Sequence, residues 1–219
     1  MMSGSTTRGA GLATGLAMGL ALAAVLTASG CVKLSKAYPQ KAYHVIEVER
    51  PSADTAPTDA PAIAVRPFHV SPGFEERGLV YRRADGSFET DFYNELFLPL
   101  ETMVTDATSR WLVRSGRFSS VLPFGSLAMS PLVLEGSVRS AYGDYRDAGN
   151  PSAALDVQFL LVRDEDLGPS VVGQIDYGIV RAPLEGTSAA DLVRGYEVAL
   201  AEVLTRLEAD LARLLSSEP

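Results

Sequence analysis

Cysteine and histidine are the scarcest reactive residues of this chain. Among 219 residues there is one cysteine, Cys31, and there are two histidines, His44 and His69. A disulfide within the chain needs two thiols, and a zinc site needs Cys or His ligands at short, regular spacings that this sequence does not offer. The sequence therefore predicts no disulfide, no cofactor and no metal site, and we expect His69 to be an ordinary edge or loop residue.

Recognisable catalytic motifs are also missing. The sequence has no GxSxG, HExxH, P-loop or GxGxxG pattern, so it offers no evident nucleophile, zinc-bound water or phosphate-binding loop. Glu89 and Asp91 lie two residues apart and could face one way on a strand, but a solvated edge explains such a pair better than catalysis. We therefore expect a protein that is not an enzyme. A lipid-anchored hydrolase would need a nucleophile that we do not identify.

Basic charge is in short supply as well. The formal net charge is −8 at pH 7, which argues against a nucleic-acid partner, because such partners demand clustered Lys and Arg. The same charge argues against attachment to an anionic membrane by electrostatics alone. The apolar fraction of 47% is ample for a core, and the length fits a single domain.

The first 30 residues have the three zones of a secretory signal peptide. Arg8 is the only charged residue among them, the segment 11–26 is rich in Ala, Gly and Leu, and small residues follow. This apolar run is shorter than the roughly 20 residues that a membrane-spanning helix needs. We therefore predict that residues 1–30 are a signal peptide that is removed.

The end of this segment resembles the lipobox of bacterial lipoproteins. Ser29 and Gly30 precede Cys31 as in that pattern, whereas Ala28 stands where the pattern usually has Leu. In such lipoproteins the cysteine thiol receives a diacylglycerol, the signal is cut before the cysteine, and the new amino group is acylated. The resemblance implies that Cys31 is the site of lipid attachment. An ordinary signal peptide before a chance cysteine, or a core cysteine in an uncleaved helix, is the alternative.

An acylated Cys31 would decide where the protein resides. Several acyl chains on one residue make a stable anchor, since each buried methylene contributes about 0.8 kcal/mol. Val32, and not Asp, follows the cysteine, and by analogy with the sorting rule of enteric bacteria this favours the outer membrane, on its periplasmic face. Residues 31–42 would then be the lipidated N-terminus and linker.

Hydrophobic patterning predicts a single α+β domain over residues 43–216. Helices are expected at 99–115 and 188–215, each with an apolar stripe. Two helices on one face of a mixed, largely antiparallel sheet give an α+β sandwich. Strands are expected at 43–48, 63–68, 79–83, 87–90 and 118–122, and three longer ones, at 132–145, 153–163 and 171–182, form an antiparallel meander.

Local signals support several of these elements. Asp85-Gly86 predicts a hairpin turn, Pro99 suits a helix start and Gly116 suits a helix end, and Ser188 resembles the first residue of a capping box. Trp111, the only tryptophan, is expected in the core.

Alternation in the last strand gives a further expectation. It places Ile175, Tyr177 and Ile179 on one face against Gln174 and Asp176 on the other.

Aromatic and charged residues mix in the stretches 79–83 and 88–97. Tyr and Arg are over-represented in interface hot spots, so we predict that Tyr81, Arg82 and Tyr93 contact a partner. The alternative is that Tyr81, Phe88 and Phe92 pack beneath the helix that follows.

Several runs resemble the ABC-type transport auxiliary lipoproteins, which are the PqiC-like lipoproteins that accompany MCE-domain (mammalian cell entry) proteins. The resemblance covers roughly residues 40–215. The runs that carry it are Val65-Arg66-Pro67-Phe68, Leu79-Val80-Tyr81-Arg82, Tyr93-Asn94-Glu95 before the Trp111 helix, Leu134-Glu135-Gly136 and Tyr142-Gly143-Asp144-Tyr145.

This resemblance implies an α+β sandwich anchored in the outer membrane. It implies a non-catalytic partner of an MCE-domain substrate-binding protein, in a system that carries lipids between membranes and hydrolyses ATP in another subunit. Only Cys31 takes a defined role from the family. The alternative is an outer-membrane lipoprotein that regulates another envelope machine, such as a peptidoglycan synthase. A homo-oligomer is a further partner that the sequence leaves open.

The lipobox gives a direct test. In cells fed a labelled fatty acid, we expect the wild-type protein to incorporate the label and the Cys31→Ser variant to incorporate none, because the hydroxyl does not replace the thiol as acyl acceptor. A Cys31→Ser protein that still carries label would contradict the assignment.

Overall fold

The structure is a computed structural model that describes residues 40–165 and 168–216. The predicted signal peptide and Cys31 lie outside the described residues. The described elements are, in chain order, β1 (Ala42–His44), β2 (Ala62–Val65), β3 (His69–Val70), β4 (Gly78–Arg82), β5 (Phe88–Leu96), α2 (Leu100–Ser115), β6 (Ser120–Leu122), β7 (Leu132–Asp144), β8 (Ser152–Arg163), β9 (Ser170–Pro183) and α3 (Ala189–Ser216).

The strands form one mixed sheet built around β7. One edge of β7 pairs with β8, and β8 pairs with β9, so that these long strands form the predicted antiparallel meander. Along its other edge β7 pairs in parallel with β2, then β3, then β4. Beyond β4 the sheet continues through β5 to β1, and beyond β2 it ends at β6. The predicted α+β class with a mixed sheet is confirmed.

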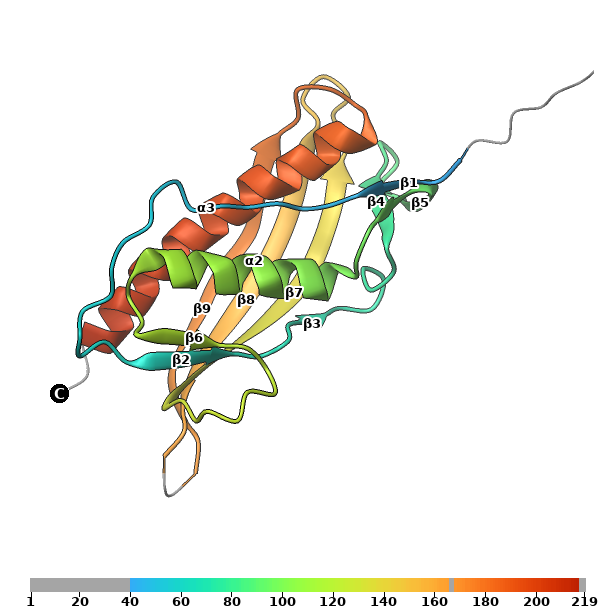
Figure 1. Ribbon diagram of the computed structural model, residues 1–219. Helices are drawn as coiled ribbons and strands as arrows, with labels where there is room; N and C mark the ends of the chain where they lie inside the picture. The colour runs from blue at the N-terminus through green and yellow to red at the C-terminus, as the bar shows by residue number, and fades with distance from the viewer. Residues whose placement is uncertain (1–39, 166–167, 217–219) are drawn as a thin grey trace, which may run out of the picture. The chain divides into compact units, whose positions relative to one another are not determined.

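Both helices pack on the same face of the meander (Figure 1). The predicted apolar stripe of α2 is buried, including Trp111, which is only 3% exposed. The inward face of β8 is apolar, since Leu155, Val157, Phe159 and Leu161 are all buried. Within the described residues, neither helix is both long enough and apolar enough to cross a membrane.

The predicted signals at the element ends hold. Pro99 precedes α2, and Gly116 ends it with a φ of 62°, in the left-handed region that favours glycine. At the start of α3 the Ser188 hydroxyl accepts the backbone N–H of Asp191, whose carboxylate accepts the backbone N–H of Ser188. This reciprocal pair is the predicted capping box. At the predicted hairpin, Gly86 has a φ of 85°.

The prediction of which β9 residues face the core is wrong for the second half of the strand. Asp156 pairs with Ile179 but Gln158 pairs with Asp176, so β9 carries one extra residue opposite β8. Gly178, with a φ of 63°, takes up that residue as a bulge. The alternation therefore reverses: Ile175 faces the core, whereas Ile179 is 45% exposed and Val180 is buried in its place.

Two short strands also differ from expectation. The strand expected at 43–48 pairs only over β1, and the chain beyond it runs across α3 (Figure 1). Ile46 and Val48 are nevertheless buried in the core, and the backbone N–H of Glu47 donates to Glu197 of α3 at 3.0 Å. The strand expected at 87–90 continues to Leu96, since it pairs with both β4 and β1.

A buried carboxylate ties this N-terminal segment to both helices. Glu208 of α3 accepts Arg50 Nε at 2.9 Å and Trp111 Nε1 of α2 at 3.0 Å, and Arg117 lies 3.4 Å away. Burial acts to raise the pKa of Glu208, but the hydrogen bonds from Arg50 and Trp111 outweigh it and hold the pKa below its ordinary value. The group is therefore ionised in the fold.

Replacing this carboxylate should weaken the fold. We expect Glu208→Gln to lower the free energy of unfolding by about 2–3 kcal/mol, because two buried donors lose a charged acceptor. The folded-state pKa is depressed, so the stabilisation is complete above the ordinary pKa of about 4.3 and is lost as the pH falls through the folded-state value. Urea unfolding at pH 7 and at pH 3 should show a difference that shrinks with acid.

A matched control is available on the same helix. Glu202 forms an i,i+4 pair with Arg206, and its side chain is 44% exposed, so Glu202→Gln should change stability little. Equal effects of the two substitutions at pH 7 would contradict the role of Glu208.

Candidate functional site

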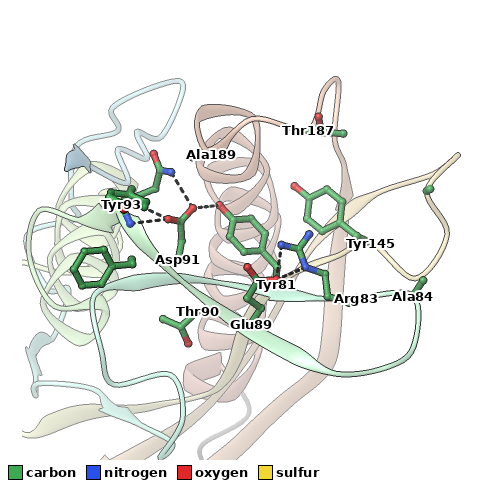
Figure 2. A pocket seen from close by; sticks show the side chains of 13 residues that line it. Tyr81, Arg83, Ala84, Glu89, Thr90, Asp91, Tyr93, Tyr145, Thr187 and Ala189 are labelled. Atoms are coloured by element: carbon green, nitrogen blue, oxygen red, sulfur yellow. Dashed lines mark hydrogen bonds and ion pairs between the residues drawn. The ribbon is translucent and has the colours of Figure 1, made fainter. Parts of the chain in front are cut away.

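A hollow of about 790 Å³ lies beside the β4–β5 hairpin. It is enclosed by β4, β5, the residues after β7 and the start of α3 (Figure 2). We call it the tyrosine hollow, after the residues that give it its chemistry, which are Tyr81, Arg83, Glu89, Asp91, Tyr93 and Tyr145.

Asp91 organises the floor of the tyrosine hollow. One carboxylate oxygen accepts the backbone N–H groups of Tyr93 and Asn94, at 2.8 and 2.9 Å. The other accepts the Tyr81 hydroxyl at 3.0 Å and the Asn94 side-chain amide at 2.8 Å. Burial alone would raise the pKa of Asp91, but these donors hold it below its ordinary value. Asp91 is thus an ionised group that positions its neighbours.

Tyr81 is part of the core more than of the surface. Its side chain is 9% exposed, and burial together with the neighbouring Asp91 raises the pKa of its hydroxyl well above the ordinary value. Its ring lies 5.7 Å from that of Tyr145, and the guanidinium of Arg83, which pairs with Glu89, lies 5.3 Å from its centre. The hydroxyl is therefore a neutral donor at neutral pH.

Two further tyrosines, Tyr93 and Tyr145, line the hollow. The Tyr145 hydroxyl is buried with no hydrogen-bond partner among the described residues, an exception to the usual pairing of buried polar groups. Tyr93 is 43% exposed and packs edge-on against Phe92, with the ring centres 5.2 Å apart. The hollow thus offers aromatic faces, a hydroxyl and the Arg83–Glu89 pair. These groups suit binding.

Arg82 lies away from the tyrosine hollow. Successive residues of a strand point to opposite faces, so Arg82 and Tyr81 diverge. The Arg82 guanidinium lies 5.4 Å from the Phe88 ring and 5.9 Å from the Tyr142 ring, next to the small cluster of Val80 and Tyr142. Of the three predicted partner residues, the structure brings Tyr81 and Tyr93 together and separates Arg82 from them. Their contact with a partner stays a prediction.

Of the three aromatics that could instead pack beneath the next helix, one is buried, and its printed neighbours are Asp91 and Tyr145. Tyr81 belongs to the main core. Phe88 and Phe92 are 53% and 68% exposed, and Phe88 packs on Tyr142, with the ring centres 5.4 Å apart.

Sequence reasoning missed Asp91 and Tyr145. Asp91 was expected to be a solvated edge residue beside Glu89, and that description fits Glu89, whose side chain is 59% exposed. The signal for Asp91 was local: an Asp followed by residues whose backbone N–H groups it can accept two and three positions later forms a turn of its own. No local signal marked Tyr145, because only the pairing of β4 with β7 brings it to Tyr81.

The histidines and acidic residues form no metal centre in the described part of the chain. There, no group of three or more His, Cys, Asp or Glu residues gathers closely enough to hold a metal ion. His44 contacts the Asn94 side chain at 3.2 Å, and His69 is exposed in β3.

Comparison with known proteins establishes a shared fold. No family model matches the chain, and no curated protein matches it. Among solved structures, XCC0632 from Xanthomonas campestris, a DUF330 protein, is 22% identical with a TM-score of 0.64, over 76% of this chain and 92% of that one. A second, uncharacterized protein is 15% identical with a TM-score of 0.56, over 80% and 99%. At these identities the likeness concerns the fold.

The role of Asp91 can be tested by its removal. We expect Asp91→Ala to lower the free energy of unfolding by about 1–2 kcal/mol, because two backbone N–H groups and the Tyr81 hydroxyl lose their acceptor. Glu89→Ala is the control, since its partner Arg83 is solvent-exposed and exposed pairs contribute little. Thermal melting of both variants gives the comparison. A larger loss from Glu89→Ala would refute this description of the site.

Proposed function

We propose that this protein is a lipoprotein of the outer membrane, facing the periplasm, and a non-catalytic auxiliary component of an ABC/MCE-type system that moves lipids between membranes. Two observations together carry the proposal. A lipobox-like segment ends at Cys31, and the domain after it has the fold of a DUF330 protein over 92% of that protein's length.

The positions of the family-like runs support this proposal. Leu79–Arg82 lies in β4, Tyr93–Glu95 in β5, and Tyr142–Tyr145 at the end of β7. The first two runs belong to one hairpin and the third is distant in sequence, and each contributes a residue to the tyrosine hollow. A surface assembled from such runs is a reasonable docking place for the partner that the family serves.

The chemistry of the tyrosine hollow favours binding over catalysis. The Asp91 carboxylate is fully occupied by internal donors, and the Tyr81 hydroxyl, whose pKa is raised, is not a base. Tyr93 instead offers exposed ring surface, the feature that tyrosine brings to protein interfaces. We propose that an MCE-domain substrate-binding protein is the partner that contacts Tyr93.

In-cell crosslinking tests this proposal. A photocrosslinking amino acid placed at Tyr93 of the lipidated protein should capture an MCE-domain protein, identified by mass spectrometry after purification from membranes. The control position is Phe124, which is 72% exposed and lies between β6 and β7, and it should capture much less of the same protein.

Other captures would overturn the proposal. Recovery of a peptidoglycan synthase or another envelope machine from Tyr93 would replace lipid transport by the regulatory alternative. Equal recovery of the MCE-domain protein from Tyr93 and Phe124 would mean that the tyrosine hollow is not the docking surface.

A further inference from the structure

Exposed aromatic side chains gather at the edge of the sheet where the described chain begins. Tyr43 of β1 is 51% exposed, and Phe92 of β5 and Phe97 just after it are 68% and 57% exposed. β1 pairs in parallel with β5, with Tyr43 opposite Glu95, and Figure 1 shows the two strands side by side. The rings therefore occupy one local surface.

Two cations lie over these rings. Lys41 Nζ lies 4.5 Å from the centre of the Phe92 ring, and the Arg77 guanidinium lies 5.7 Å from that of Tyr43. Tyr43 packs edge-on against Phe97, with the ring centres 6.4 Å apart. We call Lys41, Tyr43, Arg77, Phe92 and Phe97 the aromatic belt. Both cations pair with the single carboxylate of Glu95, which leaves one positive charge among these three groups.

The aromatic belt lies at the end of a short tether. Ten residues lead from Cys31 to Lys41, and an extended chain spans at most about 3.3–3.6 Å per residue, which is roughly 35 Å. A lipid on Cys31 would therefore keep Lys41 within that distance of the bilayer surface, whichever way the domain turns.

The charge of the tether fits an anionic bilayer. The only lysines of the chain are Lys33, Lys36 and Lys41, and residues 32–41 contain no Asp or Glu. The rest of the chain carries the acidic excess that gives a net charge of −8. Attraction between Lys and anionic headgroups falls off within a Debye length, about 8 Å at physiological salt, so it acts on the lysines that a lipid on Cys31 would keep near the bilayer.

We propose that the aromatic belt rests on the headgroup region of the phospholipid bilayer that holds the anchor. Tyr and Phe beside Lys and Arg are the residues that settle at membrane interfaces, where rings enter the boundary and cations meet phosphate. The proposal rests on the proposed acylation of Cys31. It adds that the domain has a second membrane contact of its own, which fixes the orientation of the tyrosine hollow relative to the bilayer.

Charge also argues against a second copy of the chain as the occupant. A two-fold contact between two belts would place the same surface against itself, and with it the cations Lys41 and Arg77 of each copy against those of the other. Like charges across an interface oppose association, whereas an anionic bilayer complements them.

Spin labelling of the lipidated full chain tests the proposal. Because Cys31 is the only cysteine and its thiol would be acylated, an introduced cysteine gives the only reactive thiol. Leu98→Cys places a nitroxide next to Phe97 and keeps all five belt side chains. Leu127→Cys is the matched control, an exposed leucine in the connection that follows β6, the strand at the other end of the sheet order from β1.

Both labelled proteins are reconstituted into vesicles of phosphatidylethanolamine and phosphatidylglycerol. The measurement is the collision rate of the label with oxygen, which concentrates in the bilayer, relative to a polar nickel chelate. We expect this ratio to be several-fold higher at position 98 than at position 127, and to fall when Phe92→Ser and Phe97→Ser are added.

The possible failures are distinguishable. Equal ratios at positions 98 and 127, in protein that floats with the vesicles, would contradict membrane contact by the aromatic belt but not the acylation of Cys31. Protein that does not float, and whose Cys31 reacts with the label, would overturn the anchor and the belt with it.

Discussion

An ion pair between Arg50 and Glu208 links the N-terminal segment to α3. The carboxylate also accepts Trp111 of α2, so one buried group holds the segment, α2 and α3 together. The apolar stripes of the helices explain why they cover the sheet, since burial of apolar area supplies the main driving force. They do not explain how the chain before Arg50 is held. Glu208 fixes Arg50, and before it Ile46 and Val48 are buried in the core and the backbone N–H of Glu47 donates to Glu197.

The packing of the N-terminal segment on the helices matters because the segment begins with β1, which pairs with β5. β5 then has two neighbours: β4, which carries Tyr81 toward the tyrosine hollow, and β1, which carries Tyr43 into the aromatic belt. The edge-on contact of Phe92 with Tyr93 joins the two surfaces. In the function proposed here, the surface that meets a partner and the surface that meets the bilayer are adjacent. A short tether would then present the tyrosine hollow at a limited height above the membrane.

Much of this fold could be predicted from local patterning. The long strands β7 to β9, both helices and the Asp85-Gly86 turn follow from periodicity and turn chemistry, which are properties of neighbouring residues. The face of Ile179 could not, because one glycine, Gly178, inserts a bulge that reverses the alternation. The length of β5 could not be predicted either, because most of its residues stay partly exposed and no apolar alternation marks the strand. Its pairing with β1 in parallel and with β4 in antiparallel orientation is set by tertiary contacts. Tyr145 could not be predicted for the same reason, since only the pairing of β4 with β7 brings it to Tyr81, whereas the turn that Asp91 forms with Tyr93 and Asn94 is a local signal.

We propose that a lipid on Cys31 holds this domain at a membrane, and the intact mass of the protein extracted from cell membranes is the measurement to make. We expect a chain that begins at Cys31, lacks residues 1–30, and carries the added mass of a diacylglycerol and one further acyl chain. A chain that begins elsewhere, or a Cys31 whose free thiol reacts with an alkylating reagent, would contradict it.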